Sequence, residues 1–189
     1  MRLLLLGPPG GGKGTQGARI ADEYGVEHIA SGDMLRDEVD RGTPLGTQAN
    51  AYMARGELVP DEVVVAMVLE RVQRAGRGWI LDGFPRTLPQ AKGAFAWAEA
   101  NDRTFDAVIY LDVPEDELVR RLLERAVEQG RADDDEPTIR NRLRVFDSET
   151  APLIDYYDRR GVLVKVDATG DVDDVTGRIF TAIAPFVAS

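Results

Sequence analysis

The sequence predicts an α/β fold in which a five-stranded parallel sheet carries helices on both faces. The first observation is that short apolar runs alternate along the chain with longer amphipathic stretches, a pattern typical of parallel strands joined by crossover helices. The second is the near-continuous apolar run over 107–113, which favours a strand buried on both faces. The third is the apolar run 3–6, which leads directly into a glycine-rich turn and a helix.

Glycine and proline residues mark the ends of most elements. Strands are expected over residues 3–6, 26–30, 79–81, 107–113 and 162–166. Helices are expected over 13–25, 31–41, 43–55, from 60 past 72, and over 87–101, 114–128, 138–160 and 172–186. We expect Ser31 to cap the second helix and Pro152 to bend the stretch 138–160. The polar, acidic residues 130–137 predict an exposed loop.

Length and composition restrict the class of protein. A chain of 189 residues suits one compact domain with a sizeable core. The absence of cysteine excludes disulfides and thiolate zinc sites. The net charge of -10 argues against a general nucleic-acid binder, which would normally present a basic face. No apolar run approaches the roughly 18 residues of a membrane span, and the initial leucines are too few for a signal peptide. We therefore expect a cytoplasmic protein with no membrane or nucleic-acid partner.

The turn after the first strand has the spacing of a phosphate-binding loop, Gly-x-x-x-x-Gly-Lys, over residues 7–13. Glycines let the backbone wrap closely around an anion, so that N–H groups and the positive end of the next helix point into one concavity. Lys13 supplies a mobile charge for the outer phosphates. Gly14 occupies the usual Ser or Thr position, and the hydroxyl comes one residue later, on Thr15. The alternative, a glycine-rich loop without a ligand, does not explain why strand, turn and helix follow in this order.

Further charged residues follow the second and third strands. Asp33, Arg36, Asp82 and Arg86 each lie within a few residues of a strand end, and the carboxyl ends of parallel strands meet at one edge of the sheet. Two arginines beside a phosphate loop suggest a second anionic ligand. Two carboxylates between them suggest a magnesium ion held through water. The alternative is that Asp33–Arg36 and Asp82–Arg86 are salt bridges on a solvated edge.

Three motifs together resemble those of the adenylate kinase family. They are Gly-Pro-Pro-Gly-Gly-Gly-Lys-Gly-Thr-Gln at 7–16, Ser-Gly-Asp-Met-Leu-Arg at 31–36 and Asp-Gly-Phe-Pro-Arg-Thr-Leu-Pro-Gln at 82–90. The resemblance covers essentially the whole chain, and Gly-Lys-Gly-Thr matches the family's own loop. The related uridylate–cytidylate kinases share Asp-Gly-Phe-Pro-Arg but carry asparagine where this chain has Thr87 and Gln90.

The resemblance implies a P-loop nucleotide-kinase fold with three parts. The core would comprise residues 1–29, 60–123 and 135–189. A helical, mobile part that binds the nucleoside monophosphate would span 30–59, and a short lid would span 124–134. Long-lid relatives carry a further segment, sometimes with a zinc site. This chain has no such insertion and no cysteine, so no structural zinc is expected. The family also suggests a monomer.

The resemblance also implies roles for individual residues. ATP would be bound by Gly10, Gly11, Gly12, Lys13, Gly14, Thr15, Arg121, Arg125 and Gly170. AMP would be bound by Ser31, Arg36, Glu57, Leu58, Val59, Gly83, Phe84, Pro85, Arg86, Gln90, Arg131 and Arg142. The catalytic set would be Lys13, Arg86, Arg125, Arg131 and Arg142, with Asp33 and Asp82 holding Mg²⁺ through water.

Some of these residues have a simpler explanation when each is taken alone. The amide of Gln90 can donate and accept at once, as the edge of an adenine requires, but it could equally be a solvated helix residue. Arg121 could pair with Glu117, four residues earlier on the same helix face. The single histidine, His28, is expected to be a core or strand-end residue rather than a catalytic one.

The reaction implied by the resemblance is the reversible, magnesium-dependent conversion of ATP and AMP into two ADP, which serves adenine nucleotide homeostasis and salvage. ATP, AMP and ADP would then be the small-molecule partners. Another nucleoside-monophosphate kinase is the alternative within the same class. An alternative from a different class is a catalytically silent nucleotide-binding module. A module that binds only ATP has no use for a second phosphate site, so the arginines argue against it.

Overall fold

The computed structural model describes residues 1–76, 78–129 and 135–187. The strands are β1 (Arg2–Leu6), β2 (Glu27–Ala30), β3 (Trp79–Asp82), β4 (Ala107–Asp112) and β5 (Leu163–Asp167). The helices are α1 (Lys13–Tyr24), α2 (Ser31–Asp40), α3 (Pro44–Met53), α4 (Asp61–Arg74), α5 (Leu88–Ala100), α6 (Glu115–Gln129), α7 (Glu136–Val145), the π-helix η1 (Phe146–Thr150), α8 (Pro152–Asp158) and α9 (Val172–Val187). Apart from a residue or two at their ends, most of these elements lie where the sequence predicts them.

The five strands form one parallel sheet in the order β2-β3-β1-β4-β5, which confirms the predicted architecture. The carboxyl ends of the strands therefore meet at one edge. The register sets both Leu5 and Ala30 beside Asp82. The segments that follow β1, β2 and β3 consequently begin next to one another, although some 80 residues separate the first from the last in sequence.

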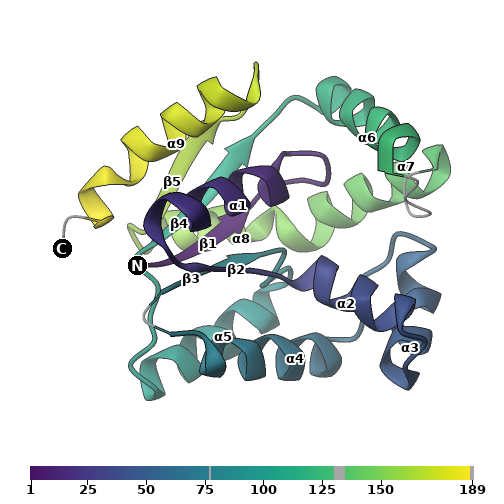
Figure 1. The fold of residues 1–189 in the computed structure, drawn as a ribbon, viewed down its shortest axis with the longest axis horizontal. Helices are drawn as coiled ribbons and strands as arrows, with labels where there is room; N and C mark the ends of the chain where they lie inside the picture. The colour runs from purple at the N-terminus through teal and green to yellow at the C-terminus, as the bar shows by residue number, and fades with distance from the viewer. Residues whose placement is uncertain (77, 130–134, 188–189) are drawn as a thin grey trace.

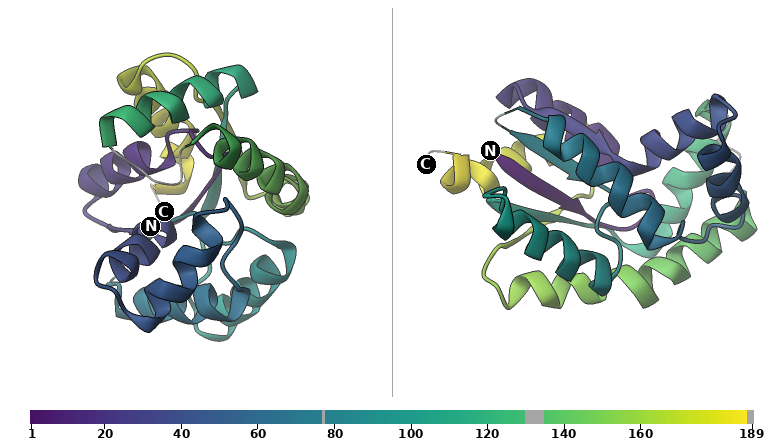
Figure 2. Two further views of the ribbon diagram at one scale, coloured as in Figure 1. Left: turned by 90° about the vertical axis from the view of Figure 1, so that its right-hand side faces the viewer. Right: turned by 90° about the horizontal axis from the view of Figure 1, so that it is seen from below.

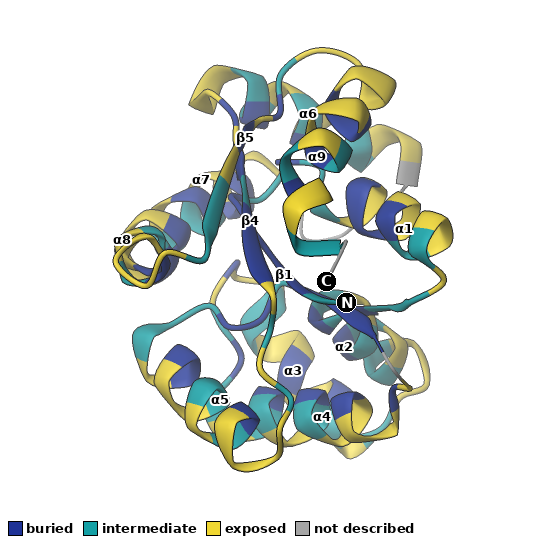
Figure 3. Ribbon diagram, turned by 90° about the vertical axis from the view of Figure 1, so that its left-hand side faces the viewer, coloured by how far each residue is buried: buried dark blue, intermediate teal, exposed yellow. Residues whose placement is uncertain are grey.

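The sheet is buried on both faces, as the apolar runs predict. In β1, Leu3 and Leu5 belong to the part of the core that α1, α6 and α9 cover, whereas Leu4 and Leu6 face α4, α5 and α8. These four side chains are almost fully buried, and each contributes about 1.5–3 kcal/mol of apolar burial. Figure 3 shows β1 and β4 buried in the centre, the edge strand β5 more exposed, and the exposed faces of the helices pointing outward.

Two of the helix caps follow the sequence closely, and one does not. Thr43 and Thr87 cap α3 and α5 by accepting hydrogen bonds from the backbone N–H groups of Gly46 (2.9 Å) and Gln90 (3.2 Å). The prediction that Ser31 caps the second helix is wrong. Ser31 is already the first residue of α2, and its hydroxyl donates to the carbonyl oxygen of Gly83 (2.8 Å) across the sheet edge.

The predicted long helical stretch 138–160 consists of three pieces. It runs through α7, widens into the π-helix η1, and continues as α8. The backbone N–H of Ala151 bonds to the carbonyl oxygen of Phe146 (2.8 Å), a five-residue spacing that comes directly before Pro152. Because proline has no N–H to donate, the regular hydrogen-bond pattern is interrupted there, which accounts for the expected bend near Pro152.

The end of the molecule opposite the termini carries two helical projections (Figure 1). Seen from that end, α6 and α7 lie above and α2 and α3 lie below (Figure 2, left). The projections touch at the residues that directly follow α3. There Asn141 of α7 donates to the carbonyl oxygen of Arg55 (2.5 Å), and Thr138 donates to that of Ala54 (3.4 Å). Residues 124–129 of the expected lid continue α6, and 130–134 lie outside the described residues. Among the described helices, none is long and apolar enough to cross a membrane.

Candidate active site

The loop between β1 and α1 has the backbone that an anion site requires. Gly10 and Gly12 have φ angles of 81° and 86°, a left-handed conformation that favours glycine. At Gly10 a side chain would also be crowded, since an added Cβ atom would lie 3.0 Å from the carbonyl oxygen of Leu118. Gly12 then forms the N-terminal boundary of α1, so the unpaired N–H groups of the first helical turn face the loop.

Lys13 is the first residue of α1, and its amine folds back over this loop. The Nζ atom donates to the carbonyl oxygens of Gly7 (2.7 Å) and Pro8 (2.9 Å). Removal of the amine from water lowers the pKa of Lys13 to about 8, an effect that the carboxylate of Asp82 opposes. The nearby charges of Arg86, Arg142 and Arg125 lower the pKa further. Positive charge is thus concentrated at this point of an otherwise acidic protein.

Asp82 ends β3 beside this lysine and is 8% exposed. Its Oδ2 atom lies 3.5 Å from Nε2 of His28, which lies within the neighbouring strand β2. Burial alone would raise the pKa of Asp82, but the contact with His28 and the charges of Lys13 and Arg86 outweigh it, so the pKa is lowered. His28 in turn fits against α1 only because residue 17 is glycine: a Cβ atom there would lie 2.5 Å from Nε2.

Asp33 and Asp82 line the cavity that contains the phosphate loop and Thr15. Asp33 is exposed and forms an ion pair with Arg36, as the salt-bridge alternative anticipated. Within residues 1–76, 78–129 and 135–187 no group of three or more acidic or histidine side chains is arranged to hold a metal. Two hard oxygen donors facing a wide cavity fit an ion that keeps most of its water, as Mg²⁺ does.

The turn after β3 is held by a chain of hydrogen bonds to the residues around it. The carbonyl oxygen of Gly83 accepts from the hydroxyl of Ser31 (2.8 Å) and from Nε of Arg86 (2.6 Å). The carbonyl oxygen of Arg86 accepts from the hydroxyl of Thr150 in η1 (2.8 Å). These contacts hold the backbone of the turn against α2 and η1, and they bond the guanidinium of Arg86 to the same turn.

Gln90 lies in the first turn of α5 and is 4% exposed, so the interpretation as a solvated helix residue is wrong. Its Oε1 atom accepts from the backbone N–H of Arg86 (2.7 Å), and its Nε2 atom donates to Oδ1 of Asp61 (2.6 Å). The amide also lines a cavity that contains Ser31, Arg36 and Val59. It is therefore a buried amide, oriented by two protein groups, in a residue that lines this cavity.

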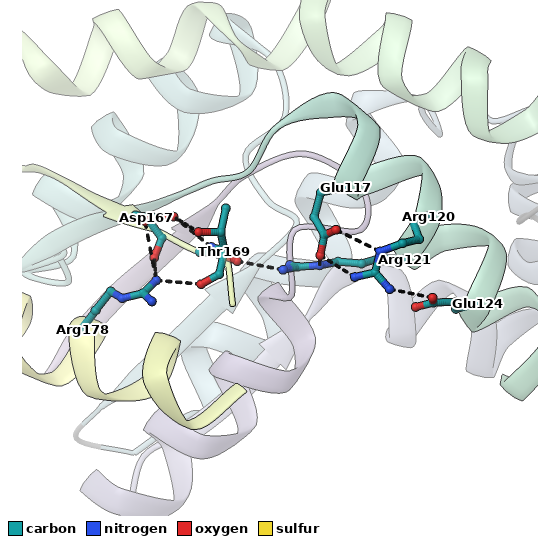
Figure 4. A network of polar contacts seen from close by, with 8 residues as sticks. Glu117, Arg120, Arg121, Glu124, Asp167, Thr169 and Arg178 are labelled. Atoms are coloured by element: carbon teal, nitrogen blue, oxygen red, sulfur yellow. Dashed lines mark hydrogen bonds and ion pairs between the residues drawn. The ribbon is translucent and has the colours of Figure 1, made fainter. Parts of the chain in front are cut away.

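On the other side of the phosphate loop, α6 contributes a network of charged side chains (Figure 4). Glu117 accepts hydrogen bonds from Arg120 (2.6 and 2.9 Å) and from Arg121 (2.8 Å), which lower the pKa of Glu117 to about 2. The pairing of Arg121 with Glu117, which the sequence offered as an alternative explanation of this arginine, is present. Arg121 also donates to the carbonyl oxygen of Ala168 (3.0 Å), so its guanidinium spans from α6 to the loop after β5.

Hydrogen bonds from α9 and within the loop hold the segment after β5 in place. Arg178 of α9 donates to the carbonyl oxygens of Asp167 (2.6 Å) and Thr169 (2.8 Å), and the carboxylate of Asp167 accepts from the hydroxyl of Thr169 (2.7 Å). Gly170 follows with a φ of 91° and lines the same cavity as Arg121. The backbone at Gly170 is consequently presented to the cavity in a defined conformation.

The site comprises two cavities that share part of their walls. One contains residues 10–16 of the phosphate loop with Arg121, Arg125 and Gly170; the other contains Ser31, the backbone of 56–59 and Gln90. The side chains of Lys13, Arg36, Arg86 and Arg142 line both cavities. Two anionic ligands, one in each cavity, would therefore meet at a common cluster of positive charge.

Comparison with known proteins agrees with this geometry. Residues 5–162 match the family model described as adenylate kinase. An adenylate kinase of Synechococcus sp. (strain CC9902) is 49% identical over 179 residues, which cover 94% of this chain and 96% of that protein. An adenylate kinase of Stenotrophomonas maltophilia (strain R551-3) is 46% identical over 185 residues, 97% of this chain and 99% of that protein. The chain belongs to the adenylate kinase family. It is an enzyme, a phosphotransferase acting on adenine nucleotides.

Most of the residues for which the sequence predicted a role in this adenylate kinase line one of the two cavities. Phe84 differs, because its side chain is 2% exposed and packs in the core between the sheet and α4 and α5. Only its backbone could contribute to the cavity. Arg131 lies outside the described residues. Arg142, on α7, lies among the shared residues of the two cavities.

Sequence reasoning missed three contributors to the adenylate kinase site. Asp61 contacts Gln90 across 29 residues, and Thr150 contacts Arg86 across 64. His28 was expected to be a core or strand-end residue, and its contact with Asp82 was not predicted. None of the three belongs to a spaced motif, so periodicity and spacing give no signal for them. Only the pairing of strands and the packing of α4 and η1 against the turn after β3 bring them to the site.

Proposed function

We propose that this adenylate kinase catalyses the reversible transfer of the terminal phosphoryl group of ATP to AMP, giving two ADP, with the donor in the cavity of the phosphate loop and the acceptor in the cavity of Gln90. The observation that carries this proposal is the set of four cationic side chains that line both cavities. Phosphoryl transfer needs donor and acceptor phosphates side by side, with their negative charge neutralised, and a shared cationic wall provides both.

The donor side follows from the loop. The N–H groups of residues 10–15 and the amine of Lys13 would hold the ATP phosphates. Arg121 would lie against the donor base, and the backbone of Gly170 would contact its edge. Because Glu117 and Ala168 already hold Arg121, its guanidinium plane requires little reordering when ATP binds.

The acceptor side uses the turn after β3 and the insertion 30–59. Arg36 and Arg86 would bind the AMP phosphate, Ser31 and the backbone of 57–59 would enclose the nucleoside, and Gln90 would contact the base. In this proposal each ligand lies between the core and one mobile part. The core comprises residues 1–29, 60–123 and 135–189, the monophosphate part comprises 30–59, and the short lid comprises 124–134.

Arg125, Arg131 and Arg142 would complete the site when the lid closes. Preorganised positive charge stabilises the charge that develops on the transferring group, and closure excludes water that would otherwise accept it. No general base is required, because the acceptor is already an anionic phosphate. His28 therefore has no proton to remove from the acceptor.

Asp33 and Asp82 would hold Mg²⁺ through water, and the bound ion would supply additional neutralisation of the donor phosphates. The sequence has no cysteine for a zinc-binding lid. We further propose that the protein works as a monomer in the cytoplasm with ATP, AMP and ADP as its partners and with no nucleic-acid partner.

A nucleotide-binding module without catalysis would not need the second cavity. The experiment that separates these functions is a panel of nucleoside monophosphates, AMP, GMP, CMP and UMP, each offered with ATP and Mg²⁺. Conversion of AMP into ADP, with the other acceptors used more slowly, supports the proposal. Binding of ATP without any acceptor phosphorylation would favour the silent module, and a preference for UMP or CMP would favour another monophosphate kinase.

A further inference from the structure

Asp61 opens α4 at the boundary of the monophosphate part, and its carboxylate joins the first turns of two helices. Oδ1 accepts from Nε2 of Gln90 (2.6 Å), and Oδ2 accepts from the hydroxyl of Thr87 (3.2 Å), which itself caps α5. Gln90 lines the acceptor cavity, whereas Asp61 is not one of the residues that line it. Asp61 would therefore reach a ligand only through Gln90.

The two neighbours of the Gln90 amide fix which way it points. A carboxylate only accepts hydrogen bonds, so the amide atom that faces Asp61 must be Nε2. A backbone N–H only donates, so the atom that faces Arg86 must be Oε1. A flipped amide would set its oxygen against the carboxylate and its NH₂ group against the N–H of Arg86, losing both bonds. The chemistry of the neighbours thus allows one orientation.

This orientation leaves one N–H of Nε2 and one lone pair of Oε1 for a ligand, because each atom already uses one of its two bonds within the protein. Adenine and cytosine present a donor amino group beside a ring acceptor. Guanine and uracil present a carbonyl acceptor in place of that amino group, with a donor beside it. A fixed amide can match only one of these two orders, whereas a freely flipping amide matches both.

We propose that Asp61 is a positioning residue for acceptor selection: it locks the Gln90 amide in the orientation that fits adenine and rejects 6-oxo and 4-oxo bases. The proposal rests on the proposed function, in which Gln90 contacts the acceptor base. Cytosine shares the hydrogen-bond order of adenine, so its rejection depends on size instead. Asp61 thus favours AMP and CMP over GMP and UMP as acceptors. It has no effect on the preference between AMP and CMP, or between GMP and UMP.

The test replaces the carboxylate with an amide of the same shape. In the variant Asp61→Asn the introduced side chain can present either its oxygen or its NH₂ group, so it accepts either orientation of Gln90 and leaves the backbone N–H of Arg86 as the remaining contact that favours one. We expect kcat/KM for GMP and for UMP, each relative to AMP, to rise by about tenfold, the effect of one hydrogen bond to a charged group. The CMP/AMP ratio should stay at its wild-type value.

Two comparisons make the test specific. Glu62→Gln removes an equal charge from the next residue of the same helix turn, where the side chain is exposed, and should leave all four acceptors unchanged. The double variant Asp61→Asn/Gln90→Ala should show the base preferences of Gln90→Ala alone, since Asp61 acts through that amide. If Asp61→Asn is unstable, Asp61→Ala replaces it, because it removes the carboxylate's requirement for Nε2 without imposing another.

If kcat/KM changes by the same factor for all four acceptors, or does not change, the proposed role of Asp61 in selection is wrong. Asp61 would then only stabilise the structure. A change in ratios that persists in the Gln90→Ala background would overturn it as well. Failure of the underlying function is recognised separately: if Gln90→Ala by itself leaves the acceptor ranking unchanged, Gln90 does not contact the base. If Gln90→Ala alters the ranking but Asp61→Asn does not, only the inference about Asp61 fails.

Discussion

The amine of Lys13 donates a 2.7 Å hydrogen bond to the carbonyl oxygen of Gly7, in the loop that it is expected to share with ATP. Together with the bond to Pro8, this contact gives the ammonium group two acceptors within the protein. Burial nevertheless removes the group from water, and this desolvation lowers its pKa to about 8. The burial of this charged group lowers the stability of the fold. A bound polyphosphate would provide negative charge beside the ammonium group, so the same lysine favours ligand binding.

Replacing Lys13 with alanine should reduce kcat by on the order of 10², because a preorganised charge at the transferring group commonly contributes this much. The fold should survive, since the charged amine is buried at a cost and lies at the sheet edge. The measurements are steady-state kinetics and thermal unfolding of the same preparation. A well-folded Lys13→Ala protein with near-normal turnover would show that the loop does not hold the donor as proposed.

The binding of ATP should weaken as pH rises through about 8. Negative phosphates raise the pKa of Lys13 above its value in the free protein, so binding takes up a proton in the window above pH 8. The linkage limits the loss of affinity to about tenfold per pH unit. Calorimetric titrations between pH 7 and pH 9 would measure it, with Lys13→Arg as the matched control, because arginine keeps its charge throughout. An identical pH dependence in both proteins would contradict the assignment.

Stability should show the opposite dependence on pH. The folded pKa of Lys13, about 8, lies below the ordinary lysine value of 10.5, so the folded state releases this proton more readily than the unfolded chain. Between these two values the unfolded state binds more protons, and this group's contribution to the free energy of unfolding therefore increases with pH. Denaturant titrations of wild type and Lys13→Arg at pH 7, 8 and 9 should show a relative gain for wild type as pH rises. A relative loss would contradict the sign of the shift.

Removal of divalent metal should abolish activity without affecting the fold. The adenylate kinase family implies Mg-ATP, and the sequence has no cysteine for a zinc-binding lid, so we expect magnesium to enter with ATP and no structural ion to be needed. A chelator should stop turnover and leave the Tm of the nucleotide-free protein unchanged. A large fall in Tm on chelation would reveal a structural ion.

The fold and the phosphate loop could be predicted from the sequence because their signals are local. The alternation of strands and helices, the four leucines of β1 and the glycines before Lys13 each depend on neighbouring residues. The hydrogen-bond partners of Gln90 could not be predicted, because Asp61 is 29 residues away in sequence and is brought near by the packing of α4 against α5. Ser31 illustrates the same limit: its hydroxyl bonds to Gly83 in the neighbouring strand's turn instead of capping its own helix.

Acceptor variants should separate recognition of the phosphate from recognition of the base. Arg86→Ala should impair AMP, GMP, CMP and UMP alike, because the guanidinium faces only the phosphate in the proposed complex. Gln90→Ala should mainly weaken the use of AMP, because the amide's remaining donor and acceptor belong to the base, at a cost of about 1–3 kcal/mol. The readout is kcat/KM for each acceptor. Unchanged AMP kinetics in Gln90→Ala would leave base recognition to the backbone of 57–59.

The most direct test of the central claim, that two nucleotides meet at the cations shared by the two cavities, is the rate of ADP formation from ATP with each monophosphate in the presence of Mg²⁺. The account predicts two ADP formed for each AMP consumed, and a preference for AMP over UMP and CMP of at least about tenfold in kcat/KM. Hydrolysis of ATP without phosphorylation of AMP, or equal use of AMP, UMP and CMP, would contradict it.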